Sequence, residues 1–356
     1  MPNIVLTGGG TAGHVTPNLA LIPLLEERGY TIHYIGSKSG IERQLIEALP
    51  RVSYYPIACG KLRRYLDLKN LSDPFKVIQG AGQATRLIHR IKPVAVFSKG
   101  GFVSVPVILG AWFNRVPSVL HESDMTPGLA NKLALPLCTR LCATFPEAAQ
   151  AAGAKGVCTG APIRPELLNG DRQRGLQVAG LAAGLPVLLI MGGSMGAQAI
   201  NDAVDAALPQ LLRHFQIIHI RGKGALNSDY AHRVGYAQFE YVNEELPDLF
   251  AACDLVLSRA GANAIWEFAA LHRPMLLIPL PLSASRGDQI KNAESFRKLG
   301  FARVLPQEDM TASKLLEELL ACHANRAAMI QAQVQGNTQS GLQALLEQIL
   351  AVAKVR

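Results

Sequence analysis

Residues 3–14, NIVLTGGGTAGH, decide the fold because they join an apolar run, a glycine turn and the start of a helix. The run NIVLT is typical of a buried strand, and the glycines permit a tight turn into the helical stretch NLALIPLLEERG. Residues 186–204, PVLLIMGGSMGAQAINDAV, repeat the same order of strand, glycine turn and helix. We therefore expect two units that each begin with this element.

Short apolar runs alternate with helical stretches throughout both halves. Runs such as VLLIM and MLLIP suit parallel strands that are covered on both faces. Beyond the two opening strands, strands are expected at 31–36, 94–98, 117–121, 216–220, 239–243, 254–258 and 274–280. This pattern predicts an α/β protein of two Rossmann-like, doubly wound parallel-sheet domains that face each other across a cleft.

The Pro-containing segment 159–168, TGAPIRPELL, is the expected linker between the domains. We predict a first domain over 1–161 and a second over 162–337. A C-terminal helix of about 338–356 is expected to pack back on the first domain.

The net positive charge lies entirely in the first half. Residues 1–161 carry 17 Lys and Arg against 9 Asp and Glu, a net +8, whereas residues 162–356 carry 18 of each sign. This asymmetry predicts that the first half meets an anionic partner, such as lipid head groups or a diphosphate. Nucleic acid would also suit the charge, but the aromatic content of 6% and the expected fold do not favour it.

The remaining composition indicates a globular cytoplasmic protein. Six cysteines form no C-x-x-C pair, so we expect reduced thiols. No basic segment followed by an apolar run is present at the N-terminus. The longest uncharged stretch, 175–201, is broken by Pro186 and by the glycines from Gly192, so it is expected to hold a buried strand rather than to span a membrane.

The first glycine loop satisfies G-x-G-x-x-G over residues 8–13, but a dinucleotide is not expected there. Such a site needs a carboxylate near the end of the second strand to bind the ribose. That strand ends in Gly36-Ser37-Lys38, and no carboxylate follows until Glu42. A dinucleotide with a 2′-phosphate would need a basic residue here, and Lys38 could serve for that variant. His14 comes directly after the loop, at a helix start that disfavours imidazolium, so it is a candidate general base.

The second half offers a better nucleotide site in residues 258–268, SRAGANAIWEF. Gly261, Ala262 and Asn263 stand at a helix start, where free N–H groups can bind a diphosphate. Glu267 follows about one turn later and could accept both ribose hydroxyls. A polar loop at 285–293 is expected to place Asp288 and Gln289 near sugar hydroxyls.

Several motifs, in this order, resemble the MurG family of GT-B glycosyltransferases. They are GGGTAGHVTPNLAL, FSKGGFVSVPV, HESDMTPGLANK, TGAPIR, MGGSMGAQAIN, SRAGANAIWE and GDQIKNAESF, which together cover nearly the whole chain. The resemblance implies transfer of N-acetylglucosamine (GlcNAc) from UDP-GlcNAc to the C4 hydroxyl of the muramoyl sugar of lipid I, giving lipid II with inversion at the anomeric carbon. It implies no metal, no cofactor, and a peripheral location on the cytoplasmic face of the bacterial membrane.

The family pattern also assigns roles to matching positions. Thr11, Ala12 and Gly13 match the loop that contacts the donor sugar and the acceptor diphosphate, and His14 matches the candidate base. Other positions match residues that contact the donor in the family. Arg164 matches a basic residue near the donor, Ser194 matches a residue that contacts phosphate, and Val242 matches the residue whose backbone pairs with uracil. The segment with Ala262, Asn263 and Glu267 matches the contacts to diphosphate and ribose, and Gln289 matches the residue that reaches the sugar.

Two positions depart from the family pattern. Ala12 stands where a glycine is common, which is tolerable if its φ is negative. In the motif His121-Glu122-Ser123-Asp124, the carboxylate of Asp124 stands where many members of the family have an amide side chain. Asp124 either takes over the role of base, or is shielded by a cation such as Lys99 or Lys132, or marks a different acceptor.

Apolar and basic residues mix in residues 60–80, which suits an anionic bilayer. The cations there are Lys61, Arg63, Arg64, Lys69 and Lys76, and the apolar residues are Leu62, Leu66, Leu71, Phe75 and Ile78. Trp112, Phe113 and Arg115 add a second such group. The alternative is that Leu66, Phe75 and Ile78 belong to the core.

Other functions fit parts of the pattern. A related glycolipid glycosyltransferase would use another acceptor. A UDP-GlcNAc 2-epimerase would share the fold and donor but would need several acids in the cleft and no basic, apolar front half. A non-enzymatic nucleotide-sugar-binding protein would tolerate loss of His14.

Overall fold

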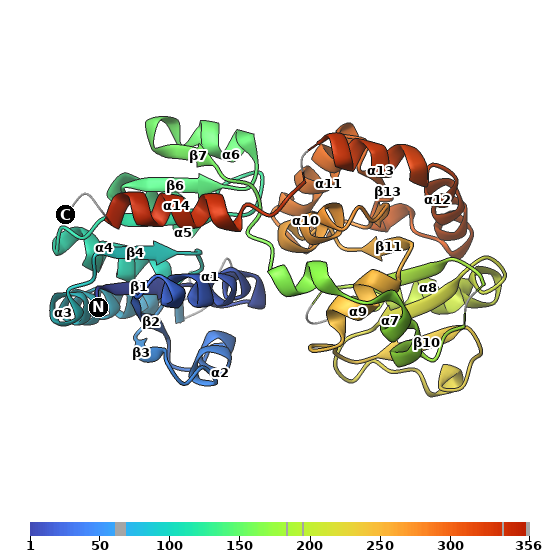
Figure 1. Cartoon of the computed structure of the whole chain (residues 1–356), viewed down its shortest axis with the longest axis horizontal. Coiled ribbons are helices and arrows are strands. Elements are labelled where there is room, and N and C mark those ends of the chain that lie inside the picture. Colours follow the sequence, from blue (N-terminus) through green and yellow to red (C-terminus); the bar gives the residue numbers. More distant parts are fainter. Residues whose placement is uncertain (61–68, 183, 194–195, 337, 354–356) are drawn as a thin grey trace. The chain divides into compact units, whose positions relative to one another are not determined.

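The chain forms two compact units in the computed structural model (Figure 1). The first comprises Met1–Arg164 and Ser340–Arg356, and the second comprises Pro165–Gln339. The structure describes residues 1–60, 69–182, 184–193, 196–336 and 338–353. Each unit is an α/β sandwich around a parallel sheet, which confirms the predicted fold class.

The first unit contains a seven-stranded parallel sheet in the order β3-β2-β1-β4-β5-β6-β7. Its strands are β1 (Asn3–Thr7), β2 (Thr31–Ser37), β3 (Ser53–Ile57), β4 (Ala95–Ser98), β5 (Ser118–Glu122), β6 (Arg140–Ala143) and β7 (Gly156–Cys158). In the central strand, Ile4 and Leu6 pack on one face of the sheet and Val5 on the other. Both faces are therefore buried, as the uninterrupted apolar runs require.

Helices cover both faces of this sheet. They are α1 (Thr16–Glu27), α2 (Ile41–Glu47), α3 (Lys69–Ile91), α4 (Ser104–Phe113), α5 (Leu129–Ala134), α6 (Pro146–Ala151) and the C-terminal α14 (Leu342–Ala353). Buried Leu345 and Ile349 of α14 share a core cluster with Leu21 of α1 and Leu6 of β1. The end of the chain thus completes the core of the first unit (Figure 1).

The second unit contains a six-stranded parallel sheet in the order β10-β9-β8-β11-β12-β13. Its strands are β8 (Val187–Met191), β9 (Gln216–Ile220), β10 (Tyr236–Phe239), β11 (Leu255–Ser258), β12 (Met275–Leu277) and β13 (Ala302–Val304). Its helices are α7 (Arg172–Ala179), α8 (Gln198–Leu211), α9 (Leu246–Ala252), α10 (Ala262–Ala270), α11 (Asp288–Lys298), α12 (Ala312–Ala324) and α13 (Arg326–Gln335).

Two local predictions were wrong. The strand expected at 239–243 lies earlier, since β10 ends at Phe239. Asp288 and Gln289 do not lie in a loop but open helix α11, because the preceding Gly287 takes φ 79° and ψ 7° and starts the helix there. Within the described ranges, no helix combines the length and the apolar character needed to cross a membrane.

Candidate active site

In the first unit, three loops meet at one edge of the sheet. Strands β1, β4 and β5 are neighbours, and Thr7 pairs with Ser98, which pairs with Leu120. The segments after these parallel strands, residues 8–14, 99–101 and 123–128, therefore lie beside one another. They contain the first glycine loop, Lys99 and Asp124.

The glycines of these loops allow backbone to approach backbone. A Cβ on Gly8 would lie 2.3 Å from the His14 carbonyl oxygen, and one on Gly101 would lie 2.1 Å from the Gly9 carbonyl oxygen. Gly101 also has φ of 84°, which glycine adopts without strain. Ala12 lies in a short 3₁₀ helix (Ala12–His14), a conformation with negative φ that a residue with a Cβ adopts as readily as glycine.

His14 is held through one ring nitrogen. Its Nδ1 lies 3.1 Å from the Gly9 carbonyl oxygen and 3.2 Å from Thr11 Oγ1. A proton on Nδ1 satisfies the Gly9 carbonyl and leaves the lone pair on Nε2, which is the tautomer that a general base needs. Burial and then the charge of Lys99 lower the pKa of His14 to about 4, against smaller opposing effects of Gly9 and Glu42. The ring is therefore neutral at physiological pH.

Lys99 is a buried cation whose charge acts on His14 and interacts with Glu122, the last residue of β5, and with Asp124. It is 2% exposed, and its Nζ donates a hydrogen bond of 2.5 Å to Ser123 Oγ. Burial lowers its pKa to about 8, while the charges of Glu122 and Asp124 favour its protonated form. Lys132 is exposed on α5. Lys99 is thus the buried cation whose charge interacts with Asp124.

Glu122 organises the loop that carries Asp124. Its carboxylate accepts hydrogen bonds from the backbone N–H groups of Asp124 (3.1 Å) and Gly128 (2.8 Å) and from the Asn131 amide (2.9 Å). Gly128 is the N-cap of α5 and makes no side-chain cap of its own. Glu122 therefore fixes the turn between β5 and α5, and with it the position of Asp124.

Glu42 gives a physical reason why the first glycine loop is no dinucleotide site. The side chain is fully buried and accepts hydrogen bonds from the Ser37 N–H (3.1 Å) and hydroxyl and from the Gly10 N–H (3.3 Å). A Cβ on Gly9 would lie 2.6 Å from this carboxylate. The Glu42 carboxylate thus already binds one amide of the loop and the end of β2. A dinucleotide would need free amides in the loop for its phosphates and a ribose contact at the end of β2.

In the second unit, the start of α10 is open. Its N-cap is Gly261, which provides no side-chain cap, and a Cβ there would meet no atom within 4 Å. Ala262 is buried, whereas Asn263 and Glu267 are partly exposed on the same helix. An uncapped helix N-terminus beside open space is a site for an anion.

Arg259 shows how the strand before α10 is fixed. Its guanidinium turns away from the helix start and donates to the Ile278 carbonyl (3.1 Å) and to Gln307 Oε1 (2.6 Å). Gln289 Oε1 accepts from the Leu280 N–H at 3.0 Å. These contacts join the segments that follow β11 and β12. They therefore hold the starts of α10 and α11 in place.

The other predicted positions are placed as follows. Val242 is 8% exposed and lies beyond the end of β10. Arg164 is partly buried at the end of the first unit's main segment. Ser194 lies outside the described residues, whereas Gly193 beside it has φ of 100° with open space around a Cβ.

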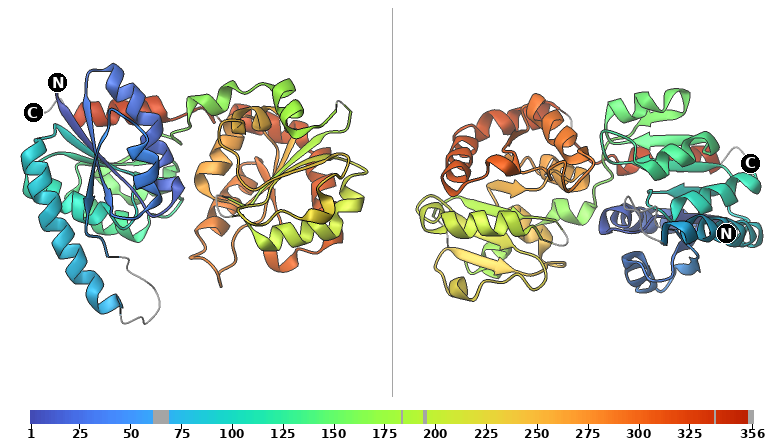
Figure 2. Two further views of the ribbon diagram at one scale, coloured as in Figure 1. Left: turned by 90° about the horizontal axis from the view of Figure 1, so that it is seen from below. Right: turned by 180° about the vertical axis from the view of Figure 1, so that it is seen from behind.

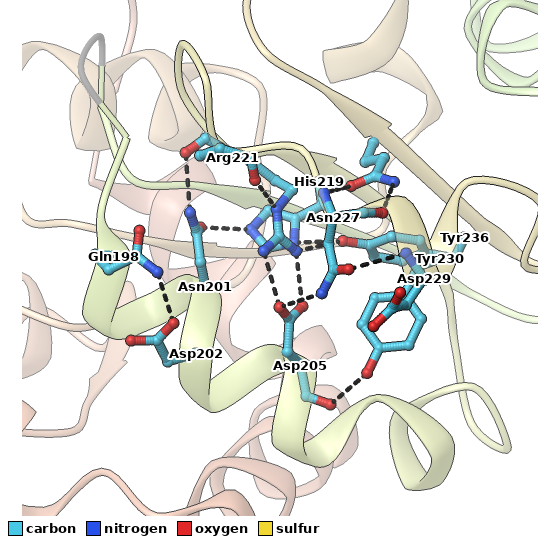
Figure 3. A network of polar contacts seen from close by, with 12 residues as sticks. Gln198, Asn201, Asp202, Asp205, His219, Arg221, Asn227, Asp229, Tyr230 and Tyr236 are labelled. Atoms are coloured by element: carbon cyan, nitrogen blue, oxygen red, sulfur yellow. Dashed lines mark hydrogen bonds and ion pairs between the residues drawn. The ribbon is translucent and has the colours of Figure 1, made fainter.

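A buried polar network that the sequence analysis missed lies between α8 and β9 (Figure 3). Arg221, 3% exposed, forms a bidentate pair with Asp205 at 2.7 and 2.8 Å and also donates to the Tyr236 hydroxyl. His219 links that hydroxyl to Asn201, with distances of 2.9 and 3.0 Å.

This network reaches the second glycine loop. Asn201 Nδ2 donates to the Arg221 carbonyl oxygen at 3.1 Å, and a Cβ on Gly196 would lie 2.2 Å from that same oxygen. Burial and then the Arg221 charge lower the pKa of His219 to about 3, so its ring stays neutral. The charged and polar side chains at the end of QIIHIRG were the available signal, since such residues rarely follow a buried strand without partners.

Two parallel-sheet units, each with a glycine loop at the carboxyl ends of its strands, have the architecture of the GT-B fold, and the family models identify the chain as a glycosyltransferase of that fold. Models of the glycosyltransferase family 28 N-terminal and C-terminal domains match residues 4–142 and 187–349. A Clostridium botulinum (strain Langeland) protein named UDP-N-acetylglucosamine--N-acetylmuramyl-(pentapeptide) pyrophosphoryl-undecaprenol N-acetylglucosamine transferase is 53% identical, over 99% of this chain and 100% of its own length. The chain belongs to glycosyltransferase family 28 and, within it, to the MurG family.

Solved structures agree with this assignment. Acinetobacter baumannii MurG superposes with a TM-score of 0.77 at 25% identity, covering 99% of this chain and 100% of that one. A putative UDP-N-acetylglucosamine 2-epimerase from Listeria monocytogenes has a TM-score of 0.69 at 12% identity, over 99% of this chain and 95% of that one. The latter likeness is one of fold alone.

The titration of His14 tests this geometry. We expect the ring to titrate near pH 4 by NMR, with its resonance assigned from a His14→Gln spectrum. Lys99→Met removes a positive charge that disfavours the imidazolium, so the midpoint should rise toward 6.5. His33 is a matched control, because burial alone lowers its pKa and Lys99 is not among the causes. A wild-type midpoint near 6.5, or one that Lys99→Met leaves unmoved, would contradict the assignment.

Proposed function

We propose that this chain transfers GlcNAc from UDP-GlcNAc to the C4 hydroxyl of the muramoyl sugar of undecaprenyl-diphospho-MurNAc-pentapeptide, lipid I, and so makes lipid II for peptidoglycan. Within the family assignment, the observation that carries the proposal is the neutral His14 ring, held at Nδ1 with Nε2 as the proton acceptor. A non-enzymatic binding protein would not need this base.

The reaction is a direct displacement at the anomeric carbon. The acceptor oxygen attacks from the face opposite UDP, the bond to the UDP oxygen breaks with its electron pair, and His14 Nε2 takes the hydroxyl proton. Thr11, Ala12 and Gly13 are assigned to the loop that contacts the acceptor diphosphate and the donor sugar. One displacement inverts the anomeric configuration.

The second unit stabilises the leaving UDP. The amides at the start of α10 and the helix dipole hold the developing charge, and Ser194 and Arg164 are assigned to it as well. Glu267 binds the ribose hydroxyls, the Val242 backbone pairs with uracil, and Gln289 contacts the sugar. The Gln289 Oε1 already accepts the Leu280 N–H, so the amide NH₂ is the group left to donate to a sugar hydroxyl.

Asp124 is assigned a charge-pairing role. Its carboxylate interacts with the buried Lys99, and its position is fixed by Glu122. A carboxylate paired with a cation is a weaker base than a free one, since the cation stabilises its ionised form. We therefore assign the role of base to His14, and we assign to Asp124 the role of balancing the charge of Lys99.

Turnover of two variants tests whether His14, and not Asp124, is the base. With UDP-GlcNAc and a soluble lipid I analogue, His14→Ala should lose about 10²–10⁴-fold in kcat, the usual contribution of a general base. Asp124→Asn should stay within about tenfold of wild type. His89→Ala, which removes an exposed histidine of α3, is the matched control and should leave kcat unchanged. Wild-type turnover in His14→Ala, or a larger loss in Asp124→Asn, would refute the assignment.

We further propose that the first unit docks on the anionic cytoplasmic face of the cell membrane as a peripheral protein. Phe75 and Ile78 of α3 are 74% and 70% exposed, which is not the burial of core residues, and Lys76 stands between them. In the left view of Figure 2, the N-terminal end of α3 extends beyond the body of the first unit. Residues 61–68, including Lys61, Leu62, Arg63, Arg64 and Leu66, lie outside the described residues.

The end of α4 adds a second apolar group. Trp112 and Phe113 are 52% and 62% exposed, and their rings contact edge to face with centroids 5.1 Å apart. Arg115 follows two residues later. Exposed aromatic rings next to cations suit the interface of an anionic bilayer.

Sedimentation with anionic vesicles tests the docking. Phe75→Ser should lower the bound fraction, with an affinity loss of about tenfold for one large apolar side chain that no longer enters the interface. High salt should also release the wild-type protein because it screens the cations. Val234→Ser, at a 91% exposed apolar residue of the second unit, should sediment like wild type. Unchanged sedimentation of Phe75→Ser, with circular dichroism intact, would refute the docking site.

A further inference from the structure

One peptide group of the first glycine loop is hydrogen-bonded on both of its edges. It joins Gly9 to Gly10. Its N–H, which belongs to Gly10, donates to Glu42 Oε2 at 3.3 Å, and its carbonyl oxygen, which belongs to Gly9, lies 3.1 Å from His14 Nδ1. The two groups of a trans peptide point in opposite directions, so this peptide lies between the Glu42 carboxylate and the His14 ring.

The Glu42 side chain is held in a fixed position against the loop. It is fully buried on α2, and its Oε1 accepts hydrogen bonds from the Ser37 N–H at 3.1 Å and from the Ser37 hydroxyl. A Cβ on Gly9 would lie 2.6 Å from the carboxylate, and one on Gly40 would lie 2.1 Å from its Oε2. Glycines on both sides therefore make room for a carboxylate directly beside the loop.

Two further buried side chains hold the backbone on either side of this peptide. The Tyr34 hydroxyl donates to the Gly8 carbonyl oxygen at 2.7 Å, and Asn18 Nδ2 lies 3.1 Å from that hydroxyl and 3.2 Å from the His14 carbonyl oxygen. Both side chains thus bind carbonyl groups. Of the three side chains, Glu42 is the one that binds an N–H of the loop, and it does so on the peptide that holds the ring.

This arrangement lets the carboxylate act on the histidine through the peptide. A negative charge at the N–H of a buried peptide polarises that peptide and strengthens its carbonyl oxygen as an acceptor. A stronger acceptor at Gly9 favours the proton on His14 Nδ1 and leaves the lone pair on Nε2. The Gly9 contact and the Glu42 charge both favour the protonated ring, against the burial and the Lys99 charge that lower the His14 pKa to about 4.

Three other titratable side chains interact with the Glu42 charge. They are Tyr34, Tyr54 and Cys59, and each has a raised pKa, with burial as the main cause and the Glu42 charge as a further one. They are therefore neutral near pH 7. The charges that act on the His14 ring are those of Lys99 and Glu42, and their effects are opposite.

We infer that Glu42 is a positioning residue of the transfer reaction, which orients the His14 ring and selects its tautomer through the Gly9–Gly10 peptide. A histidine that acts as a base is often oriented by a carboxylate that contacts it directly. Here the peptide takes the place of that direct contact, and the carboxylate stays buried beside the loop. The inference rests on the proposed role of His14 as the general base.

Replacement of Glu42 by glutamine tests the inference at nearly constant side-chain volume. Two Ser37 donors share Oε1, so the glutamine oxygen is expected to stay with them and its NH₂ to face the Gly10 N–H. In Glu42→Gln, kcat with UDP-GlcNAc and a lipid I analogue should fall about tenfold, the effect of one charge-assisted hydrogen bond, while KM for UDP-GlcNAc should not change. The His14 midpoint, followed by NMR, should fall below the wild-type value of about 4, because a negative charge that favours the imidazolium is lost.

A double-mutant cycle separates positioning from a general loss of structure. In His14→Ala, the further change Glu42→Gln should not lower the residual kcat, because its effect passes through the ring. Tyr54→Phe is the matched control, since it removes a hydrogen bond of 2.6 Å to the Ser37 carbonyl oxygen and leaves the contact of Glu42 with Gly10 in place. This control should keep the wild-type kcat and the wild-type His14 midpoint.

Wild-type kcat or an unmoved His14 midpoint in Glu42→Gln would overturn the inference, as would an equal loss of kcat in the wild-type and His14→Ala backgrounds. If Glu42→Gln does not fold, hydrogen exchange of the wild-type protein decides. A Gly10 amide that exchanges as fast as in an unfolded chain would overturn the inference, and a protected amide supports it. Full activity in His14→Ala would instead reject the proposed base, so the two failures are distinguishable.

Discussion

The contact of glycine backbone with glycine backbone beyond β1 and β4 is the constraint on which the first half-site depends. The Gly9 carbonyl is held against Gly101, where a Cβ would lie 2.1 Å from the oxygen, and that same carbonyl lies 3.1 Å from His14 Nδ1. Any side chain at Gly101 would displace the group that sets the tautomer of His14. The proposed role of His14 as a base thus depends on packing as much as on its own chemistry.

The two units use one supersecondary element in opposite ways. In the first, Glu42 binds the glycine loop through the Gly10 N–H, and His14 follows as a neutral ring. In the second, the N-cap of α10 is Gly261, which has no side chain to cap the helix, and a Cβ there would meet no described atom within 4 Å. In the proposed reaction the first loop serves the acceptor, whose hydroxyl proton His14 takes, and the start of α10 serves the leaving diphosphate. The same strand, turn and helix would then serve the nucleophile in one unit and the leaving group in the other.

Much of this arrangement could be predicted from the sequence, because local signals carry it. The strand, glycine turn and helix at 3–14 and at 186–204 predict the parallel sheets, and the missing acid after β2 argues against a dinucleotide. The contacts of Glu42 could not be predicted, because they join residues 32 positions apart through a fold that brings β2 beside β1. The Arg221–Asp205 pair was missed for the same reason, since no spacing along the chain identifies a partner 16 residues away. Gln289 was misplaced in a loop because the helix start depends on the conformation of Gly287, not on composition.

The account rests on one displacement by the acceptor hydroxyl, assisted by His14. The most direct test is the structure of the product formed from UDP-GlcNAc and a lipid I analogue, determined by NMR together with the release of UDP. We predict UDP release only when the acceptor is present, with one GlcNAc joined to the muramoyl C4 oxygen in the β configuration, inverted from the donor. A product with retained configuration, or UDP released equally well without acceptor, would contradict direct displacement.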